Sequence, residues 1–214
     1  MSDSSKYAHY FRRALLEMAN TDRELVWVSQ EIPFAAMRAA YPLGIFPWPG
    51  NDPDLIPWVC PLERGVLQLS KFRLGRSTRR GLAKSSFRVS FNQAHREVIR
   101  ACAEVPGRET WIHPKLVVAY EAAFRCGWLQ SVEVWEGEAL VGGLFGVDCG
   151  KVFSGESMFH CRDHAGKAAV AALVARLQAR GDALLDIQQL TPHMAAMGAE
   201  NWTREQYWEA LGGI

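Results

Sequence analysis

The sequence has little of what marks secreted, membrane-spanning or disulfide-stabilised proteins. Its five cysteines are odd in number and form no Cys-x-x-Cys pair, which argues against a disulfide framework. No apolar run approaches about 18 residues, and no signal peptide opens the chain. These absences predict a reduced, cytoplasmic protein with free thiols that does not enter a membrane.

One short segment gathers potential metal ligands, namely His160, Cys161 and His164. Ligands confined to a single strand-to-helix junction rarely close a coordination sphere by themselves. We therefore interpret them as turn and helix-start residues, and we expect neither a metal ion nor another cofactor.

Charge is nearly balanced over the 214 residues, with a formal net charge of +1, but it is not evenly spread. No Asp or Glu occurs from Arg64 to Arg96. Within that stretch Arg73, Arg76, Arg80 and Lys84 recur at a spacing that predicts one side of a helix over 73–84. A stripe of one sign attracts phosphates; a solvated charged face is the alternative.

The first 62 residues are predicted to form a small N-terminal α/β domain, followed by a larger domain over 63–214. Helices over 7–19 and 33–40 enclose an apolar run at 25–28. The stretch 41–50 is so rich in proline, glycine and aromatic residues that we expect neither helix nor central strand. Held rigid by its prolines, it can offer aromatic rings to a base, or it can simply pack against the core.

The larger domain alternates short β-type and α-type segments. Strands are predicted over 64–69, 87–91, 131–135, 139–147, 151–158 and 183–188, and helices over 73–84, 93–103, 114–126, 167–179 and 203–211. Thr203 and Gln206 predict a capping box at the last helix. From residue 131 the order is β-β-β-α-β-α, which predicts an α+β fold: a mixed sheet flanked by helices, as in GNAT acyltransferases.

Three polar side chains interrupt the last two predicted strands of this series: Glu156, Asp186 and Gln188. Burial of a carboxylate without a partner is costly, so such residues are either paired or used in chemistry. Asp163 stands where a GNAT enzyme carries the cation or amide that holds the coenzyme A pyrophosphate. Because a carboxylate repels a pyrophosphate, acetyl transfer from coenzyme A is disfavoured.

Over roughly residues 40–210 the chain resembles the leucyl/phenylalanyl-tRNA–protein transferases. The resemblance is carried by Gly44-Ile45-Phe46-Pro47-Trp48, Thr110-Trp111-Ile112, Ser131-Val132-Glu133-Val134-Trp135, Leu140-Val141-Gly142-Gly143-Leu144-Phe145-Gly146-Val147, Gly155-Glu156-Ser157-Met158-Phe159 and Leu185-Asp186-Ile187-Gln188. Such enzymes transfer Leu, Phe or sometimes Met from aminoacyl-tRNA to the N-terminal Arg or Lys of a protein, which marks it for the N-degron pathway. They use a GNAT-like domain without coenzyme A.

The resemblance implies residue roles. Trp48 and Trp111 would flank the 3′-terminal adenine of the tRNA, since aromatic stacking tolerates any base. Met158, Leu144 and Phe153 would line the pocket for the amino-acid side chain, although core packing is a competing interpretation of Leu144 and Phe153.

The implied reaction is aminolysis of an ester by an α-amine, whose pKa near 7.7–8.0 demands only modest help in losing a proton. Asp186, with Gln188 on the same strand face, is the expected helper, either as a general base or by positioning the amine. Glu156 on the neighbouring strand would hold a substrate ammonium group, and the Gln188 amide or backbone N–H groups would face the oxyanion.

The chain departs from the family pattern at 28–32, 130–131, 160–161 and 166–167, and these departures leave the acceptor amine open. The expected partners are the 3′-aminoacyl-adenosine end of a tRNA and a protein or peptide N-terminus, with a monomeric enzyme favoured. Transfer to a small-molecule or peptide amine is the main alternative, and an inert RNA-binding module is another.

Overall fold

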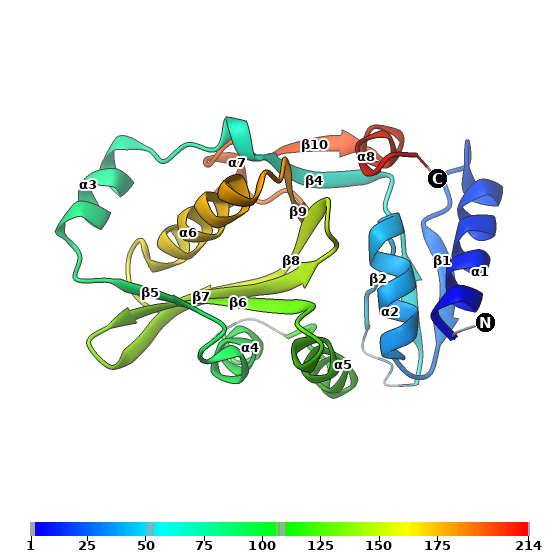
Figure 1. The fold of residues 1–214 in the computed structure, drawn as a ribbon, viewed down its shortest axis with the longest axis horizontal. Coiled ribbons are helices and arrows are strands. Elements are labelled where there is room, and N and C mark those ends of the chain that lie inside the picture. The colour runs from blue at the N-terminus through cyan, green and yellow to red at the C-terminus, as the bar shows by residue number, and fades with distance from the viewer. Residues whose placement is uncertain (1–2, 51, 53, 106, 108–109, 214) are drawn as a thin grey trace. The chain divides into compact units, whose positions relative to one another are not determined.

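The computed structural model describes residues 3–50, 52, 54–105, 107 and 110–213 (Figure 1). Its helices are α1 (Asp3–Met18), α2 (Phe34–Ala40), α3 (Arg76–Lys84), α4 (His95–Ala103), α5 (Pro114–Arg125), α6 (Ala165–Arg180), α7 (Pro192–Ala195) and α8 (Arg204–Leu211). Its strands are β1 (Leu25–Ser29), β2 (Phe46–Pro47), β3 (Ile56–Val59), β4 (Glu63–Gln68), β5 (Arg88–Phe91), β6 (Leu129–Glu136), β7 (Ala139–Asp148), β8 (Val152–His160), β9 (Leu184–Gln188) and β10 (Glu200–Thr203). None of the described helices is long and apolar enough to span a bilayer.

Contacts between residues divide the chain into two compact units. The first comprises residues 1–64, 111–125 and 201–214, and the second comprises residues 65–110 and 126–200. The helices α5 and α8 therefore belong with the N-terminal segment by contact, although both lie beyond residue 62. The division into domains at 1–62 and 63–214 stays a prediction.

The first unit is built on a small antiparallel sheet with the strand order β1-β3-β2. Trp58 of β3 is fully buried, and its ring lies 5.3 Å from that of Trp27 and 6.0 Å from that of Phe11. Pro47 lies in β2 at the sheet edge, where a residue without an N–H is tolerated. The prediction that 41–50 holds no helix is wrong at Tyr41–Leu43, which forms one 3₁₀ turn with Pro42 near its start.

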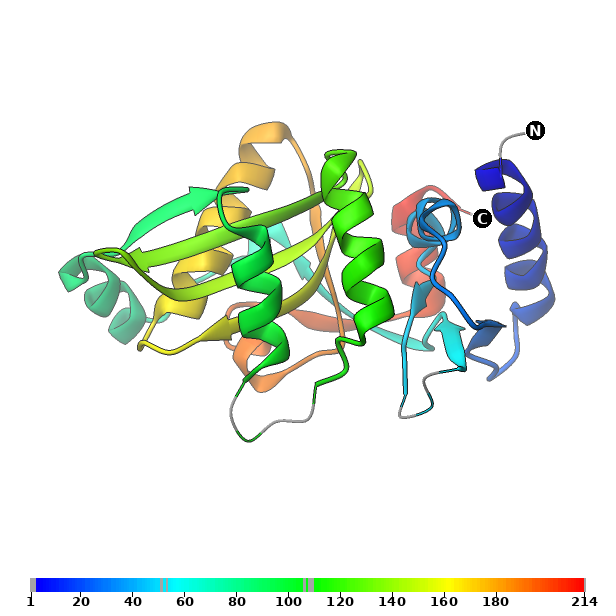
Figure 2. The ribbon, with the colours of Figure 1, turned by 90° about the horizontal axis from the view of Figure 1, so that it is seen from below.

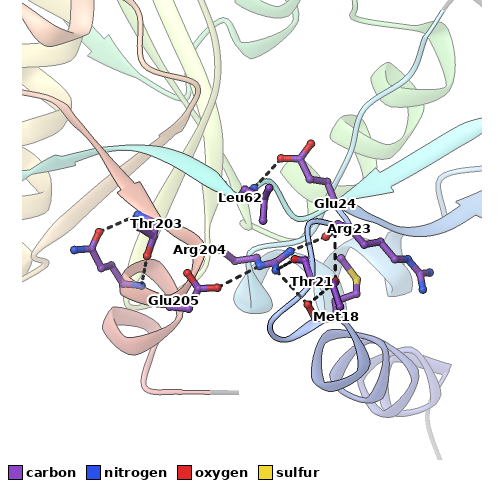
Figure 3. A network of polar contacts seen from close by, with 9 residues as sticks. Met18, Thr21, Arg23, Glu24, Leu62, Thr203, Arg204 and Glu205 are labelled. Carbon is purple, nitrogen blue, oxygen red and sulfur yellow. Dashed lines mark hydrogen bonds and ion pairs between the residues drawn. The ribbon is translucent and has the colours of Figure 1, made fainter.

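Arg204, at the start of α8, joins that helix to the end of α1 (Figure 3). The side chain is only 1% exposed, and its guanidinium donates to the carbonyl oxygens of Met18, Thr21 and Arg23 over 2.7–3.2 Å. Met18 is the last residue of α1, and Thr21 and Arg23 lie in the segment that follows it, so the arginine holds the chain where this helix ends. The predicted capping box of Thr203 and Gln206 is confirmed directly beside it.

Replacement of Arg204 by Met should lower the free energy of unfolding by about 3 kcal/mol or more, because three carbonyl groups at and after the end of α1 lose a charged donor that is itself buried. Urea denaturation would measure the loss. Arg13→Met is the matched control, because Arg13 is 74% exposed and pairs only with Glu17 in the described contacts of its side chain; its cost should stay below about 0.5 kcal/mol. Equal losses in the two variants would contradict an anchoring role for Arg204.

The large sheet has the strand order β10-β4-β9-β8-β7-β6-β5. The strands β6, β7 and β8 form an antiparallel meander, α6 crosses over, β9 pairs parallel to β8, and β4 pairs antiparallel to β9. The helices α6 and α4 cover opposite faces of the meander (Figures 1 and 2). The predicted order β-β-β-α-β-α and the α+β, GNAT-like fold are thereby confirmed, whereas β3, β10 and α7 had no sequence prediction.

The basic helix begins later than predicted. Arg73 lies in an extended segment, where its backbone N–H donates to the Met197 carbonyl oxygen, and α3 starts only at Arg76 after the N-cap Gly75. Because that hydrogen bond holds Arg73 outside the helix, the predicted four-residue stripe is wrong in this respect. Of the four predicted residues, only Arg76, Arg80 and Lys84 lie in the helix, and all three are exposed.

Candidate active site

Two irregularities in neighbouring strands bring the polar residues of the second unit together. In β8, Ser157 lies opposite Phe145 and Gly155 opposite Gly146, so Glu156 is an additional residue between them. In β9, Ile187 is the additional residue between Asp186 and Gln188. A β-bulge of this kind bends the strand and redirects the side chains around it. The described pairing of β8 with β9 runs from Val152–Leu184 to Ser154–Asp186, immediately before both bulges.

Asp186 is fully buried, and its side chain closes a turn with the backbone of Gln188. Its Oδ1 accepts the backbone N–H of Gln188 at 2.8 Å, and its Oδ2 accepts the hydroxyl of Ser154 at 3.4 Å. A carboxylate that binds the N–H two residues ahead closes an Asx-type turn. The carboxylate thus shapes the backbone that presents Gln188. Ser154 was not a sequence candidate, although it occupies the same polar run as Glu156.

Gln188 has a left-handed backbone conformation with φ of +60°, which is uncommon for a residue other than glycine. The next residue folds back at once, because the N–H of Gln189 donates to the Ile187 carbonyl oxygen at 2.6 Å. The expectation that Asp186 and Gln188 share a face by simple strand alternation is therefore wrong. The bulge and the turn at Gln188 determine their directions instead.

The side chain of Gln188 meets Glu156 across the two strands. Its Nε2 donates to Oε1 of Glu156 at 3.3 Å, and the two residues are 8% and 7% exposed. The three predicted polar residues thus form one connected group, in which Asp186 contacts the backbone of Gln188 and Glu156 contacts its amide. Strained backbone and buried polar groups of this kind cluster at functional sites.

Glu133 is a useful comparison inside the same sheet. It is fully buried, accepts the hydroxyls of Ser90 and Ser131 at 2.6 and 2.5 Å, and has a further bond from the Ala94 N–H at 3.4 Å. Several donors compensate this carboxylate without a bulge or an unusual φ angle at its own position. A polar residue within a strand is therefore not by itself a sign of catalysis.

Of the three apolar candidates, Phe153 and Met158 lie on β8 with Glu156 and Leu144 lies on the neighbouring β7, and the three differ in burial. Leu144 and Phe153 are buried members of the hydrophobic core, while Met158, which is opposite Leu144 in the sheet register, is partly exposed and packs against that core. Burial favours the core interpretation of Phe153. Met158 has the most exposed side chain of the three.

Trp48 and Trp111 both belong to the first unit, and both are partly exposed. The backbone N–H of Trp48 donates to the Pro57 carbonyl oxygen at 2.8 Å, and its ring lies 5.6 Å from that of Phe46. Arg64, 2% exposed, stacks on Phe46 and Tyr207 at 4.5 and 4.8 Å and donates to the Gly44 carbonyl oxygen at 3.0 Å. These contacts fix the loop that carries Trp48. The sequence did not indicate this role of Arg64.

The helix α3 is joined to the start of α6. Lys167 Nζ donates to Thr78 Oγ1 at 3.4 Å, and the α3 backbone at Gly81 lies directly against the His164 ring. Nearby, the rings of His160 and His193 stack at 6.3 Å. Within the described part of the chain, no group of three or more His, Cys, Asp or Glu side chains is arranged to hold a metal ion.

Burial lowers the pKa of His193 below its usual 6.5, and the nearby Lys167 and His160 add to the effect. Because the folded state disfavours the protonated ring, the unfolded state takes up more protons as the pH falls below 6.5, and stability falls with it. Urea midpoints should therefore drop between pH 7.5 and 5.5, and the drop should be smaller in His193→Gln. The exposed His9→Gln is the control; an identical drop in all three proteins would contradict the assignment.

Comparisons with known proteins agree with this architecture. Residues 66–212 match the family described as leucyl/phenylalanyl-tRNA protein transferase. The chain is 45% identical over 190 residues to the leucyl/phenylalanyl-tRNA–protein transferase of Syntrophotalea carbinolica, covering 87% of this chain and 82% of the relative. The corresponding protein of Shewanella denitrificans is 40% identical over 190 residues, with 89% and 81% covered. Among solved structures, FemX superposes with a TM-score of 0.51 at 12% identity over 95% of this chain and 79% of that chain, a likeness of fold alone.

Proposed function

Because the chain belongs to the leucyl/phenylalanyl-tRNA protein transferase family and is thus an aminoacyltransferase, we propose that it transfers Leu, Phe or Met from aminoacyl-tRNA to a protein N-terminus. The acceptor is a protein that begins with Arg or Lys, and the product is a substrate for N-degron proteolysis. The observation that carries this proposal is the connected group of Glu156, Asp186 and Gln188 at the paired bulges of β8 and β9.

The chemistry is an exchange of an ester for an amide. The α-amine attacks the carbonyl carbon of the aminoacyl ester, the new C–N bond forms, and the bond to the ribose oxygen breaks. The amine loses one proton and the ribose oxygen gains one, so the reaction consumes no cofactor. A free α-amine is half deprotonated at a pH equal to its pKa of about 8, so it needs only modest help to lose its proton. The protein's main tasks are therefore to orient the two substrates and to stabilise the developing oxyanion.

Each member of the polar group has a task in this reaction. Glu156 holds the substrate ammonium group until it loses a proton to become the attacking amine, and the Gln188 amide donates toward the oxyanion. Asp186 is a positioning residue for Gln188, which is supported by its complete burial and by its bond to the Gln188 N–H. The rival role of Asp186 as a general base requires a carboxylate that can reach the amine.

Asp186→Ala should lower kcat roughly 100-fold and leave the Kd for tRNA nearly unchanged. Asp186→Asn distinguishes the two roles, because its side-chain oxygen still accepts the Gln188 N–H but cannot take a proton at neutral pH. If Asp186 positions Gln188, the Asn variant keeps clearly more activity than the Ala variant. Equal activity in the two variants would support the general base, and loss of tRNA binding in both would indicate a structural role.

The remaining residues bind the tRNA. Trp48 and Trp111 stack on the terminal adenine, at about 1–3 kcal/mol per stacked base. Met158, with Leu144 and Phe153 behind it in the core, receives the amino-acid side chain, since methionine adapts to several apolar shapes. Arg76, Arg80 and Lys84 on α3, together with Arg73 before it, bind tRNA phosphates.

Arg76→Ala combined with Arg80→Ala should weaken tRNA binding and reduce the slope of log Kd against log salt by between about 1 and 2, because two phosphate contacts are lost. The exposed pair Arg12 and Arg13 on α1, both replaced by Ala, controls for the change in net charge. An unchanged slope in the α3 variant would show that this helix does not contact phosphate.

The proposed reaction is tested directly with radiolabelled Phe-tRNA and a peptide that begins with Arg. The label should appear in the peptide, and an N-acetylated copy of the same peptide should remain unlabelled, because its amine is blocked. Absence of transfer while tRNA still binds would favour an inert RNA-binding protein. Transfer to small amines but not to the peptide would favour the alternative acceptor.

A further inference from the structure

Gly65 on β4 lies opposite Gln188 in the pairing of β4 with β9. It is buried, and its backbone does not have the positive φ angle that would itself require glycine. The reason for glycine here is space. A Cβ atom at this position would lie 2.7 Å from the carbonyl carbon of Gln189, 2.7 Å from the backbone nitrogen of Leu190 and 3.0 Å from Cγ1 of Ile187.

These close neighbours form the turn that presents Gln188. Ile187 is the bulged residue, Gln188 has the left-handed conformation, and Gln189 folds back onto Ile187. Two of the three contacts are with backbone atoms, which cannot rotate away as the end of a flexible side chain could. A methyl group at position 65 therefore has to push the turn outward by several tenths of an ångström.

We propose that Gly65 is a positioning residue for Gln188. Because Gly65 has no side chain, the bulge of β9 can pack closely against β4, and this close packing directs the Gln188 amide toward Glu156. The inference rests on the proposed aminoacyl transfer, in which that amide acts on the reacting ester. Both bonds that define the group, from the Gln188 N–H to Asp186 at 2.8 Å and from its amide to Glu156 at 3.3 Å, depend on where this turn lies.

Gly65→Ala tests the proposal. The variant should lower kcat for transfer of Phe from Phe-tRNA to an Arg-starting peptide by about 10-fold, because misplacement of a catalytic group by about 1 Å costs roughly 100-fold and the expected shift is a fraction of that. Its Kd for tRNA should change less than twofold. Gly75→Ala is the matched control for kcat: a Cβ there meets nothing within 4 Å, and kcat should stay at the wild-type value.

A double-variant cycle separates positioning from general damage. If Gly65 acts through the Gln188 amide, Gly65→Ala should add no further loss in kcat once Gln188→Ala has removed that amide. A double variant whose loss equals the product of the two single losses would overturn the proposal. So would a Gly65→Ala enzyme with wild-type kcat, while the proposed aminoacyl transfer would then stand.

A second measurement keeps the proposal testable should Gly65→Ala fail to fold. Gln188→Gly and Gln188→Ala both lack the amide, but only glycine adopts a φ of +60° without strain. The glycine variant should therefore show the higher thermal midpoint, the reverse of the usual order within a strand. A higher midpoint for Gln188→Ala would show that the turn is absent in solution, and the role of Gly65 would fail independently of any activity assay.

Discussion

The arrangement of the candidate site depends on two β-bulges in adjacent strands. The parallel pairing of β8 with β9 continues to Ser154 and Asp186, and each strand then takes in one additional residue. Regular strands would alternate their side chains between the two faces of the sheet. The bulges interrupt this alternation at the same level in both strands, and thereby bring a glutamate and a glutamine from different strands into contact.

Burial makes this arrangement costly, and the hydrogen bonds offset the cost. Removing a carboxylate from water costs several kcal/mol unless it is paired or hydrogen-bonded, and Asp186 has no exposed surface. Its bond to the Gln188 N–H is of the charge-assisted type, which is roughly twice as strong as a neutral one. The same bond holds Gln188 at a φ angle that it would otherwise rarely adopt. The single hydrogen bond between Asp186 and the Gln188 N–H therefore both compensates the buried carboxylate and stabilises the strained backbone of Gln188.

Local patterns in the sequence were sufficient to predict most of the helices and strands after residue 62. Glycine-containing turns at 137 and 150 mark the meander, and Thr203 with Gln206 marks the start of α8, because these signals act over a few residues. The missed elements depend on partners far along the chain: β10 pairs at the edge of the large sheet, and Arg73 is held outside α3 by Met197. The bulges were also missed. Glu156, Asp186 and Gln188 could be chosen as candidates from their residue types, but their mutual geometry could not, since a register shift leaves no mark in the residues that carry it.

Two adjacent residues of β4 show why residue type alone is an incomplete guide to a site. Arg64 has a charge, yet it is almost fully buried, and its guanidinium is used between two aromatic rings and the Gly44 carbonyl oxygen to fix the loop of Trp48. Gly65 has no functional group at all, yet any side chain there would collide with the backbone after Gln188. A search for reactive side chains passes over both residues. What they contribute is the position of other groups, and because a shift of about 1 Å can cost a hundredfold in rate, position is the part of the chemistry that a fold must supply.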